Sequence, residues 1–243
     1  MPLPDDLAGG SPAELSAPRF DLITCVDGAV LKAAALPEIL VTLKNGGAAG
    51  WRFSPRALGP AGPVNLTSLD WRDAEQLDLT VLSQITAQLA GANTQAALCL
   101  IPASFHTLSS QKGRAEIASR IGELAIQEKC RVVLELRDLK GVPLERMTAV
   151  VNQIRPACFS IVAEVAVDKA ELGLIASSGV SGVVLRTVGD WTQDAKASAA
   201  VTAFCDTARR ITPIRIGRAA DRSRLPVLER AGFTHASVPI RSA

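Results

Sequence analysis

The sequence predicts an α/β fold of the TIM-barrel type, a (β/α) barrel that begins with an antiparallel β-hairpin. Short apolar runs of β type alternate with amphipathic helical patterns through most of the chain. These runs are continuously apolar, which is typical of parallel strands that are covered on both faces. Near the end, Pro213–Gly217, Asp221–Phe233 and Thr234–Pro239 have the pattern of strand, helix and strand, which is one βαβ unit.

Three strand candidates near the start of the chain predict the antiparallel part. They are Phe20–Cys25, Glu38–Lys44 and Gly50–Phe53. Asp27-Gly28 follows the first, and Asn45-Gly46-Gly47 separates the other two, and both are hairpin-type turn signals. Pro, Gly and polar residues are frequent in residues 56–70, so this segment is expected to be a loop.

After that loop, helices and strands alternate. The expected helices are Glu75–Gly91, Gly113–Lys129, Pro143–Ile154, Asp168–Ser177 and Trp191–Ile211, and the expected strands between them are Ala96–Ile101, Arg131–Leu136, Cys158–Ala163 and Ser181–Arg186. Side chains expected to cap helices are Asp168 and, for the helix after Ile101, Thr107, Ser109 and Ser110. A doubly wound open sheet is the alternative, but no Gly-rich phosphate loop follows any strand.

Composition excludes several classes of function. A net charge of +2 without a dense Lys/Arg block argues against nucleic-acid binding. No apolar run reaches the ~18 residues of a membrane span, and no signal peptide is recognised, so a cytoplasmic protein without membrane insertion is expected. The five cysteines have no paired spacing and are interpreted as small buried hydrophobes. Residues 1–19 are interpreted as a flexible tail or linker, and residues 20–243 as one barrel domain.

In a barrel of this type, the functional residues lie at the C-terminal ends of the strands. The residues assigned to these ends as a tentative anion- or partner-binding set are Arg52, Glu135, Arg137, Glu164, Arg186 and Arg218, and Arg215 and His235 are also placed there. Arginines at strand ends suit a phosphate or a carboxylate. The two glutamates could form an acid–base pair or salt bridges with neighbouring arginines, and both readings stay open. His106 and His235 belong to no two-histidine motif, so no metal site, cofactor or catalytic residue is predicted.

The order of these segments resembles the EAL domain family, bacterial phosphodiesterases that open the cyclic dinucleotide c-di-GMP. Ile214–Gly232 is similar to the segment in which an A-E-G-V-E-T strand end leads into a helix. Arg131–Asp138 is similar to the L-E-I-T-E strand, and Leu98–Ser104 stands where the family has V-N-L-S. Gly50–Ser54 stands where the family has the E-A-L signature, and the likeness spans roughly Glu38 to Pro239.

The resemblance implies two divalent metals held by strand-end carboxylates and an Asn, which generate the attacking hydroxide. This sequence departs from that set at most positions. The signature Glu falls at Arg52, the Asn near Ile101, the paired aspartates at Ala163 and Glu164, the Gly-rich loop at Val165–Asp168, the Lys at Leu185 and Arg186, and the last Glu at Ile216. Only Glu135 and Glu164 remain as carboxylates. The resemblance therefore implies a degenerate member without phosphodiesterase activity.

Three hypotheses of function follow. The first is a catalytically inactive EAL-like domain in bacterial signalling that acts as a regulatory or protein-interaction module, with another protein or a homodimer mate as partner. A c-di-GMP receptor without turnover is a variant of it, disfavoured because the acidic set is lost. The second is a TIM-barrel enzyme that binds a phosphorylated or carboxylated small molecule through strand-end arginines. The third is a structural domain of a larger assembly, which an exposed apolar patch would favour.

Overall fold

The computed structural model describes residues 15, 18–90, 92, 97–167, 169–186 and 191–240. The strands in this part of the chain form one sheet of ten in the order β1-β2-β10-β9-β8-β7-β6-β5-β3-β4. Because β2 also pairs with β3, the strands from β2 round to β3 close into a barrel. The predicted barrel with an antiparallel start is confirmed, and the predicted tail over residues 1–19 lies almost wholly outside the described residues.

The strands are β1 (Asp21–Thr24), β2 (Val30–Thr42), β3 (Ala48–Gly59), β4 (Gly62–Pro63), β5 (Leu98–Ser104), β6 (Arg131–Arg137), β7 (Ser160–Val165), β8 (Gly182–Leu185), β9 (Ile214–Arg218) and β10 (His235–Pro239). The α-helices are α1 (Trp71–Leu89), α2 (Phe105–Ser109), α3 (Gln111–Gln127), α4 (Leu144–Ile154), α5 (Lys169–Ser178), α6 (Ala195–Ala208) and α7 (Leu225–Arg230). Short 3₁₀ turns are η1 (Leu66–Ser68), η2 (Arg155–Ala157), η3 (Trp191–Gln193) and η4 (Arg222–Arg224).

Strand β2 runs antiparallel to both of its barrel neighbours, β3 and β10, whereas the other neighbouring barrel strands are parallel. The hairpin β2–β3 is longer than expected, because β3 continues to Gly59 opposite the N-terminal half of β2. The prediction of a loop over residues 56–70 is therefore wrong at its start. The reason is that the small side chains of Ala33 and Ala57 pair across the extension and are both buried, which stabilises the ladder there.

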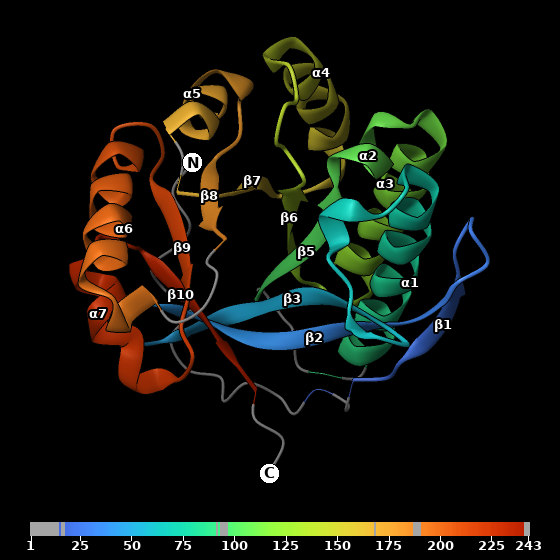
Figure 1. Ribbon diagram of the computed structural model, residues 1–243, viewed down its shortest axis with the longest axis horizontal. Helices are drawn as coiled ribbons and strands as arrows, with labels where there is room; N and C mark the ends of the chain where they lie inside the picture. Colours follow the sequence, from blue (N-terminus) through green and yellow to red (C-terminus); the bar gives the residue numbers. More distant parts are fainter. Residues whose placement is uncertain are drawn as a thin grey trace.

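The helices lie outside the strands and the β1–β2 hairpin projects to one side (Figure 1). Ser110 caps α3 by accepting a hydrogen bond from the Gly113 N–H at 2.9 Å, as predicted. Thr107 and Ser109, in contrast, lie within α2, and Ser104 caps that helix. The expected cap Asp168 lies outside the described residues. The helix expected over residues 191–211 is divided into η3 and α6, because Asp194 caps α6 from within it. Within the described chain, no helix is both long and apolar enough to span a membrane.

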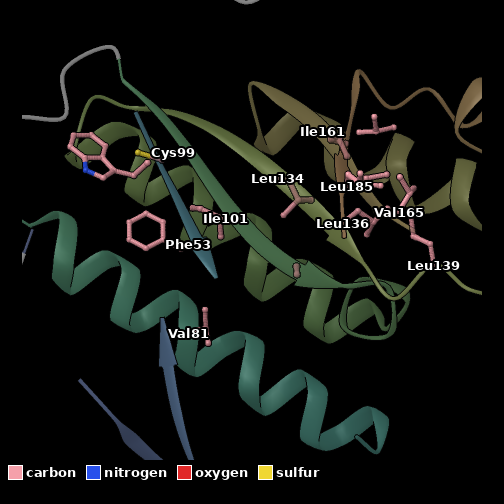
Figure 2. Close-up of a cluster of buried hydrophobic side chains, with 14 of the residues drawn as sticks. Phe53, Val81, Cys99, Ile101, Leu134, Leu136, Leu139, Ile161, Val165 and Leu185 are labelled. Carbon is pink, nitrogen blue, oxygen red and sulfur yellow. The ribbon is translucent and has the colours of Figure 1, made fainter. Parts of the chain in front are cut away.

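Two apolar cores lie on the two sides of the barrel wall. The outer core packs outward-facing strand residues against the helices, and Figure 2 shows Phe53 and Ile101 on the side of Val81 of α1. The inner core fills the lower barrel and is called the floor here. It consists of Leu40, Ala49, Leu98, Leu100, Val133, Val162, Val184, Ile214 and Ile216. Apolar layers inside the ring make the lower barrel a packed core and not a channel.

Gly50 is required where β3 enters the barrel. Its φ is +151°, and a Cβ built on it would lie 1.9 Å from the backbone oxygen of Leu98 on β5. The register of β2 and β3 is irregular beside it, between Leu40 and Val41. Only glycine combines this backbone conformation with so close an approach of two strands.

The cysteines occupy apolar surroundings, as predicted. Cys25, Cys99, Cys130 and Cys205 are buried and Cys158 is half-buried, and all five are free thiols. Burial raises the pKa of Cys158 to about 11 and that of Cys205 to about 12. These two thiols therefore stay protonated at neutral pH and are poor nucleophiles.

Candidate functional site

A layer of charged side chains lies directly above the floor. These side chains occupy the next inward-facing positions along the strands. Because successive strand residues point to opposite faces, the next inward position after Val162 is Glu164, and after Ile216 it is Arg218. The members of this layer, called the rim layer here, are Glu38, Arg52, Glu135, Glu164, Arg186 and Arg218. The barrel interior thus changes from apolar to ionic within two residues on several strands.

Arg52 is the centre of the rim layer. Its guanidinium donates to both carboxylate oxygens of Glu135, from Nε to Oε2 at 2.7 Å and from Nη2 to Oε1 at 2.6 Å. Its Nη1 donates to Oε2 of Glu38 at 3.0 Å. Arg52 is 6% exposed and both glutamates are 1% exposed. A buried charge without a partner would be very costly, so the three side chains require one another.

Glu38 is held from further directions. Ser54 donates its hydroxyl to Oε1 at 2.9 Å, and Arg218 on β9 reaches the same oxygen with Nη2 at 2.8 Å. Burial works to raise the pKa of Glu38, but the charges of Arg52 and Arg218 outweigh it, and the pKa lies below its ordinary value. Burial likewise opposes the charge of Arg52, but Glu135 and Glu38 keep its pKa above the usual range. The shifts of these two pKa values both favour the charged forms of Glu38 and Arg52.

A second buried ion pair links the rim to the outer helices. Arg137, at the end of β6, donates from Nη2 to Oδ1 of Asp78 on α1 at 2.7 Å. The other oxygen of Asp78 accepts from the backbone N–H of Ser104 at 2.7 Å and from the hydroxyl of Thr107 at 2.6 Å. Burial works against the charge of Arg137, yet Asp78 raises its pKa above the ordinary value. Asp78 thereby fixes Arg137 and the beginning of α2 together.

A pocket of about 260 Å³ lies above the rim layer, and we call it the rim pocket. Its charged lining residues are Arg52, Arg56, Arg137, Asp138, Glu164, Arg186 and Arg218, and residues 64–67 form one wall. Within the described part of the chain, the Glu164 carboxyl has no hydrogen bond or ion pair. Its burial and the nearby charge of Glu135 raise its pKa above the ordinary value, although Arg137, Arg52 and Arg186 act in the opposite direction.

The structure brings together five of the six residues of the predicted binding set as lining of one pocket. They are Arg52, Arg137, Glu164, Arg186 and Arg218. Glu135, the sixth, lies beneath Arg52 and is engaged by it, so the salt-bridge reading is correct for this residue. It does not form an acid–base pair with Glu164.

Three sequence assignments to the rim are wrong. Arg215 and His235 lie at the beginnings of β9 and β10, so they are at the opposite end of the barrel. Arg215 donates there to the backbone carbonyls of Gly232 and Thr212. Ile101 points outward into the helical core, and the inward residue beside it is Pro102.

Sequence reasoning also missed Glu38 and Asp78. Glu38 begins the predicted strand Glu38–Lys44, so it would be placed at the bottom of a parallel barrel. Because β2 (Val30–Thr42) is reversed, the residues that precede Leu40 of the floor reach the rim. The signal for this was a charged residue inside an otherwise apolar run. Asp78 had no such signal, since it lies on a helix among other polar residues.

Carboxylates in the described residues do not gather as metal ligands usually do. No group of three or more His, Cys, Asp or Glu side chains there lies close enough together to hold a metal ion. Glu38 and Glu135 converge on one point, but that point is occupied by the guanidinium of Arg52.

No family model and no curated protein sequence matches the chain. Solved structures nevertheless share its fold. The FimX EAL domain from Pseudomonas aeruginosa, bound to c-di-GMP, has a TM-score of 0.62 at 14% sequence identity, over 85% of this chain and 88% of that one. The match therefore extends over most of both chains.

Two longer proteins are similar over a part of their chains. The Bacillus subtilis YkuI protein, which has an EAL domain and is in complex with substrate c-di-GMP and calcium, has a TM-score of 0.62 at 11% identity over 86% of this chain. The Klebsiella pneumoniae BlrP1 manganese and c-di-GMP complex has a TM-score of 0.60 at 12% identity over 97% of this chain. This chain spans 56% and 60% of those two chains. At these identities the likeness establishes the fold, and it confirms the EAL-type barrel that the sequence predicted.

Proposed function

We propose that this chain is a non-hydrolytic EAL-type barrel that acts in c-di-GMP signalling as a regulatory or protein-interaction module. One observation carries the proposal. A buried guanidinium, Arg52, stands at the position that the resemblance assigns to the signature glutamate, and it binds the two carboxylates that converge there. An ion pair of the protein itself thus takes the place where the resemblance implies catalytic cations.

The residues around Arg52 do not fit a two-metal site. Divalent cations of this kind take several oxygen ligands, mainly carboxylates. Glu38 and Glu135 are already bound to Arg52, the inward neighbour on β5 is Pro102, and Ile216 on β9 belongs to the apolar floor. A fixed positive charge at the centre would also repel a metal ion, at close range and in a medium of low dielectric constant. We therefore infer no step of hydrolysis through bound metal.

Support for a role in protein interaction comes from the β1–β2 hairpin. Four large apolar side chains are exposed on or beside it: Phe20, Leu22, Val26 and Val30, at 49%, 67%, 58% and 47%. Strand β1 pairs only with β2, so among the described residues its other edge is open. An open edge with apolar outward side chains suits the addition of an extended segment of a partner protein.

The proposal is tested by measuring c-di-GMP hydrolysis with Mg²⁺ or Mn²⁺, with an active EAL phosphodiesterase as the positive control. We expect no turnover, and turnover would contradict the proposal. Binding of c-di-GMP is measured in parallel by calorimetry. Tight binding without turnover would make the barrel a receptor, and weak or absent binding leaves the protein-interaction role.

That role has its own test, in which proteins bound to the wild-type chain in native extracts are compared with those bound to Leu22→Asp. We expect the variant to lose a partner that the wild type retains. The matched control is Ile126→Asp, since Ile126 is 79% exposed and lies on helix α3, outside the β1–β2 hairpin. Equal capture by the two aspartate variants would exclude the hairpin as the docking site.

One observation favours the second candidate, an enzyme acting on a small anionic molecule. Glu164 lies in the rim pocket with Arg186 and Arg218, and burial beside Glu135 raises its pKa above the ordinary value, as is useful in a general base. Glu135, the other acid considered, is excluded from this role because Arg52 holds both of its oxygens. Products formed from a panel of phosphorylated and carboxylated metabolites, in the wild type and in Glu164→Gln, would distinguish an enzyme from a binding module.

A further inference from the structure

The rim pocket has more hydrogen-bond donors than the acids of the barrel engage. Arg56 and Arg186 both line it, and within the described residues neither guanidinium has a hydrogen bond or an ion pair. Arg218 extends Nη2 to Glu38, and its side chain remains 37% exposed. Arg56 lies on β3, Arg186 follows the end of β8 and Arg218 is the last residue of β9, so the three cations reach the pocket from different strands.

A fourth donor is buried in the wall. Arg137 is 5% exposed and lines the pocket, and it gives Nη2 to Asp78. Its Nε is fully buried and has no acceptor in the described part of the chain. Buried polar atoms of native proteins are nearly always hydrogen-bonded. Among the described residues, Arg137 thus leaves one buried donor in the pocket wall for an incoming anion to satisfy.

The size and arrangement of the pocket restrict the ligand. Its volume of about 260 Å³ is below the roughly 300–1,000 Å³ of sites that enclose a drug-sized molecule. A carboxylate is planar and matches a single guanidinium fork. Guanidiniums that converge from β3, β6, β8 and β9 are better matched by an anion with oxygens in several directions. A tetrahedral oxyanion has that shape.

We propose that the rim pocket binds a compact tetrahedral oxyanion, inorganic phosphate or the terminal phosphoryl group of a small metabolite, through Arg56, Arg137, Arg186 and Arg218. The proposal rests on the proposed function, since it names the ligand to which a barrel without metals responds. It assigns no chemistry to the bound anion.

Glu164 sets the strength of this binding. Its carboxyl lies in the same pocket, near Glu135 and Arg137 of β6, Arg52 of β3 and Arg186, which follows β8. A charged Glu164 competes with the incoming anion for the arginines and repels it. Removal of its charge, either by protonation or by Glu164→Gln, should therefore strengthen binding.

The test uses the full chain and calorimetric titration with inorganic phosphate at low ionic strength and neutral pH. Arg186→Ala and Arg56→Ala remove guanidiniums that have no partner in the described structure, so the fold is expected to persist. Each should weaken phosphate binding tenfold or more, because a charge-assisted hydrogen bond is lost. Glu164→Gln should bind several times more tightly. The matched control, Arg230→Ala on α7, removes the same charge at an exposed position and should bind as the wild type does.

Further titrations identify the source and the shape of the anion. Tighter binding of glycerol phosphate than of phosphate would assign the site to a metabolite, and the reverse order would assign it to the free ion. No saturable phosphate binding, or equal binding by Arg186→Ala and the wild type, would overturn the proposal. Equal affinity for succinate would contradict the claim that the ligand is tetrahedral. Displacement of phosphate by c-di-GMP that binds more tightly would contradict the claim that the ligand is compact. The proposed function fails by a different result, since only hydrolysis of c-di-GMP would contradict it.

Discussion

The floor and the rim layer lie one above the other on successive inward-facing positions of the barrel strands, yet they are stabilised by different forces. The floor is nine apolar side chains that need only fill space. The rim layer is a set of charges in which Arg52 requires Glu38 and Glu135 at 3.0 Å or less. Hydrophobic burial is non-directional, whereas buried ions depend on defined partners. One barrel can therefore tolerate exchanges among apolar side chains in its lower half and still require particular charged side chains in its upper half.

This difference suits the binding role that we propose for the rim pocket. The floor stabilises the ring through burial of apolar surface. The rim layer fixes Arg52 in a defined direction, because the carboxylates of Glu38 and Glu135 each accept more than one charged or hydroxyl donor. Above that fixed layer, the arginines of the rim pocket face solvent or ligand. Rigid support beneath a donor-rich pocket is the arrangement that pre-organised binding sites use.

Replacement of Arg52 by Met has the largest expected effect. It leaves the buried Glu38 and Glu135 without their shared cation, so the free energy of unfolding should fall by about 3–5 kcal/mol. Urea denaturation at neutral pH measures it. The triple variant Glu38→Gln, Arg52→Met, Glu135→Gln should recover most of the loss, because no unpaired charge remains. If Arg52→Met alone lowered the free energy of unfolding by less than about 1 kcal/mol, the ion pairs of Arg52 would not be what stabilises the rim layer.

Truncation of the floor by Leu100→Ala should cost about 3 kcal/mol, within the usual range for a buried leucine. The loss should be the same at acid and neutral pH, since no titratable group is involved. The measurement is denaturant unfolding at several pH values. A marked dependence on pH would mean that the floor and the rim layer are coupled, and the contrast between them would fail.

Glu38→Gln should lower the free energy of unfolding by about 1.5–3 kcal/mol at neutral pH, because it removes charged hydrogen bonds to Arg52 and Arg218. The folded pKa of Glu38 is below its ordinary value, so its contribution is complete above that ordinary value and is lost as the pH falls through the folded pKa. The difference between variant and wild type should therefore shrink in acid. A constant difference down to the acid limit of folding would contradict the assigned pKa direction.

The smallest expected effect is an increase in the free energy of unfolding, for Glu164→Gln. The pKa of Glu164 is raised by burial and by Glu135, so its ionisation opposes folding as the pH rises through the folded pKa. Glu164→Gln should then stabilise the chain by about 0.5 kcal/mol at pH 8, and by nothing in acid, where the wild-type side chain is also neutral. Thermal unfolding at both pH values measures it, and destabilisation at pH 8 would contradict the assigned direction.

The sequence predicted the apolar strands that carry the floor and five of the six residues of the rim layer. Val162, Val184 and Ile216 lie in apolar runs, and such runs indicate buried parallel strands whatever their neighbours are. The cationic half of the rim was also predicted, because Arg52, Arg186 and Arg218 follow those runs. Glu135 and Glu164 were predicted with it, but Glu38 was not. The hairpin signal at residues 45–47 indicates that β2 runs antiparallel to β3, but it does not reveal which side chains of the closed barrel Glu38 meets. Pairing between residues such as Glu38 and Arg218 is a property of the closed ring.

Closure of the ring by β2 and β10 has a consequence for biosynthesis. The first barrel strand, β2, is synthesised early, but one of its two neighbours within the barrel is β10, the last strand described. Until then β2 exposes an edge that can pair with other nascent chains, and late, non-local contacts of this kind slow folding. Arg52 likewise donates a hydrogen bond from Nη1 to the hydroxyl of Ser237, which comes 185 residues later in the sequence. A chain released before β10 is made would keep that edge open, so C-terminal truncations of this protein should be recovered as aggregates bound to chaperones.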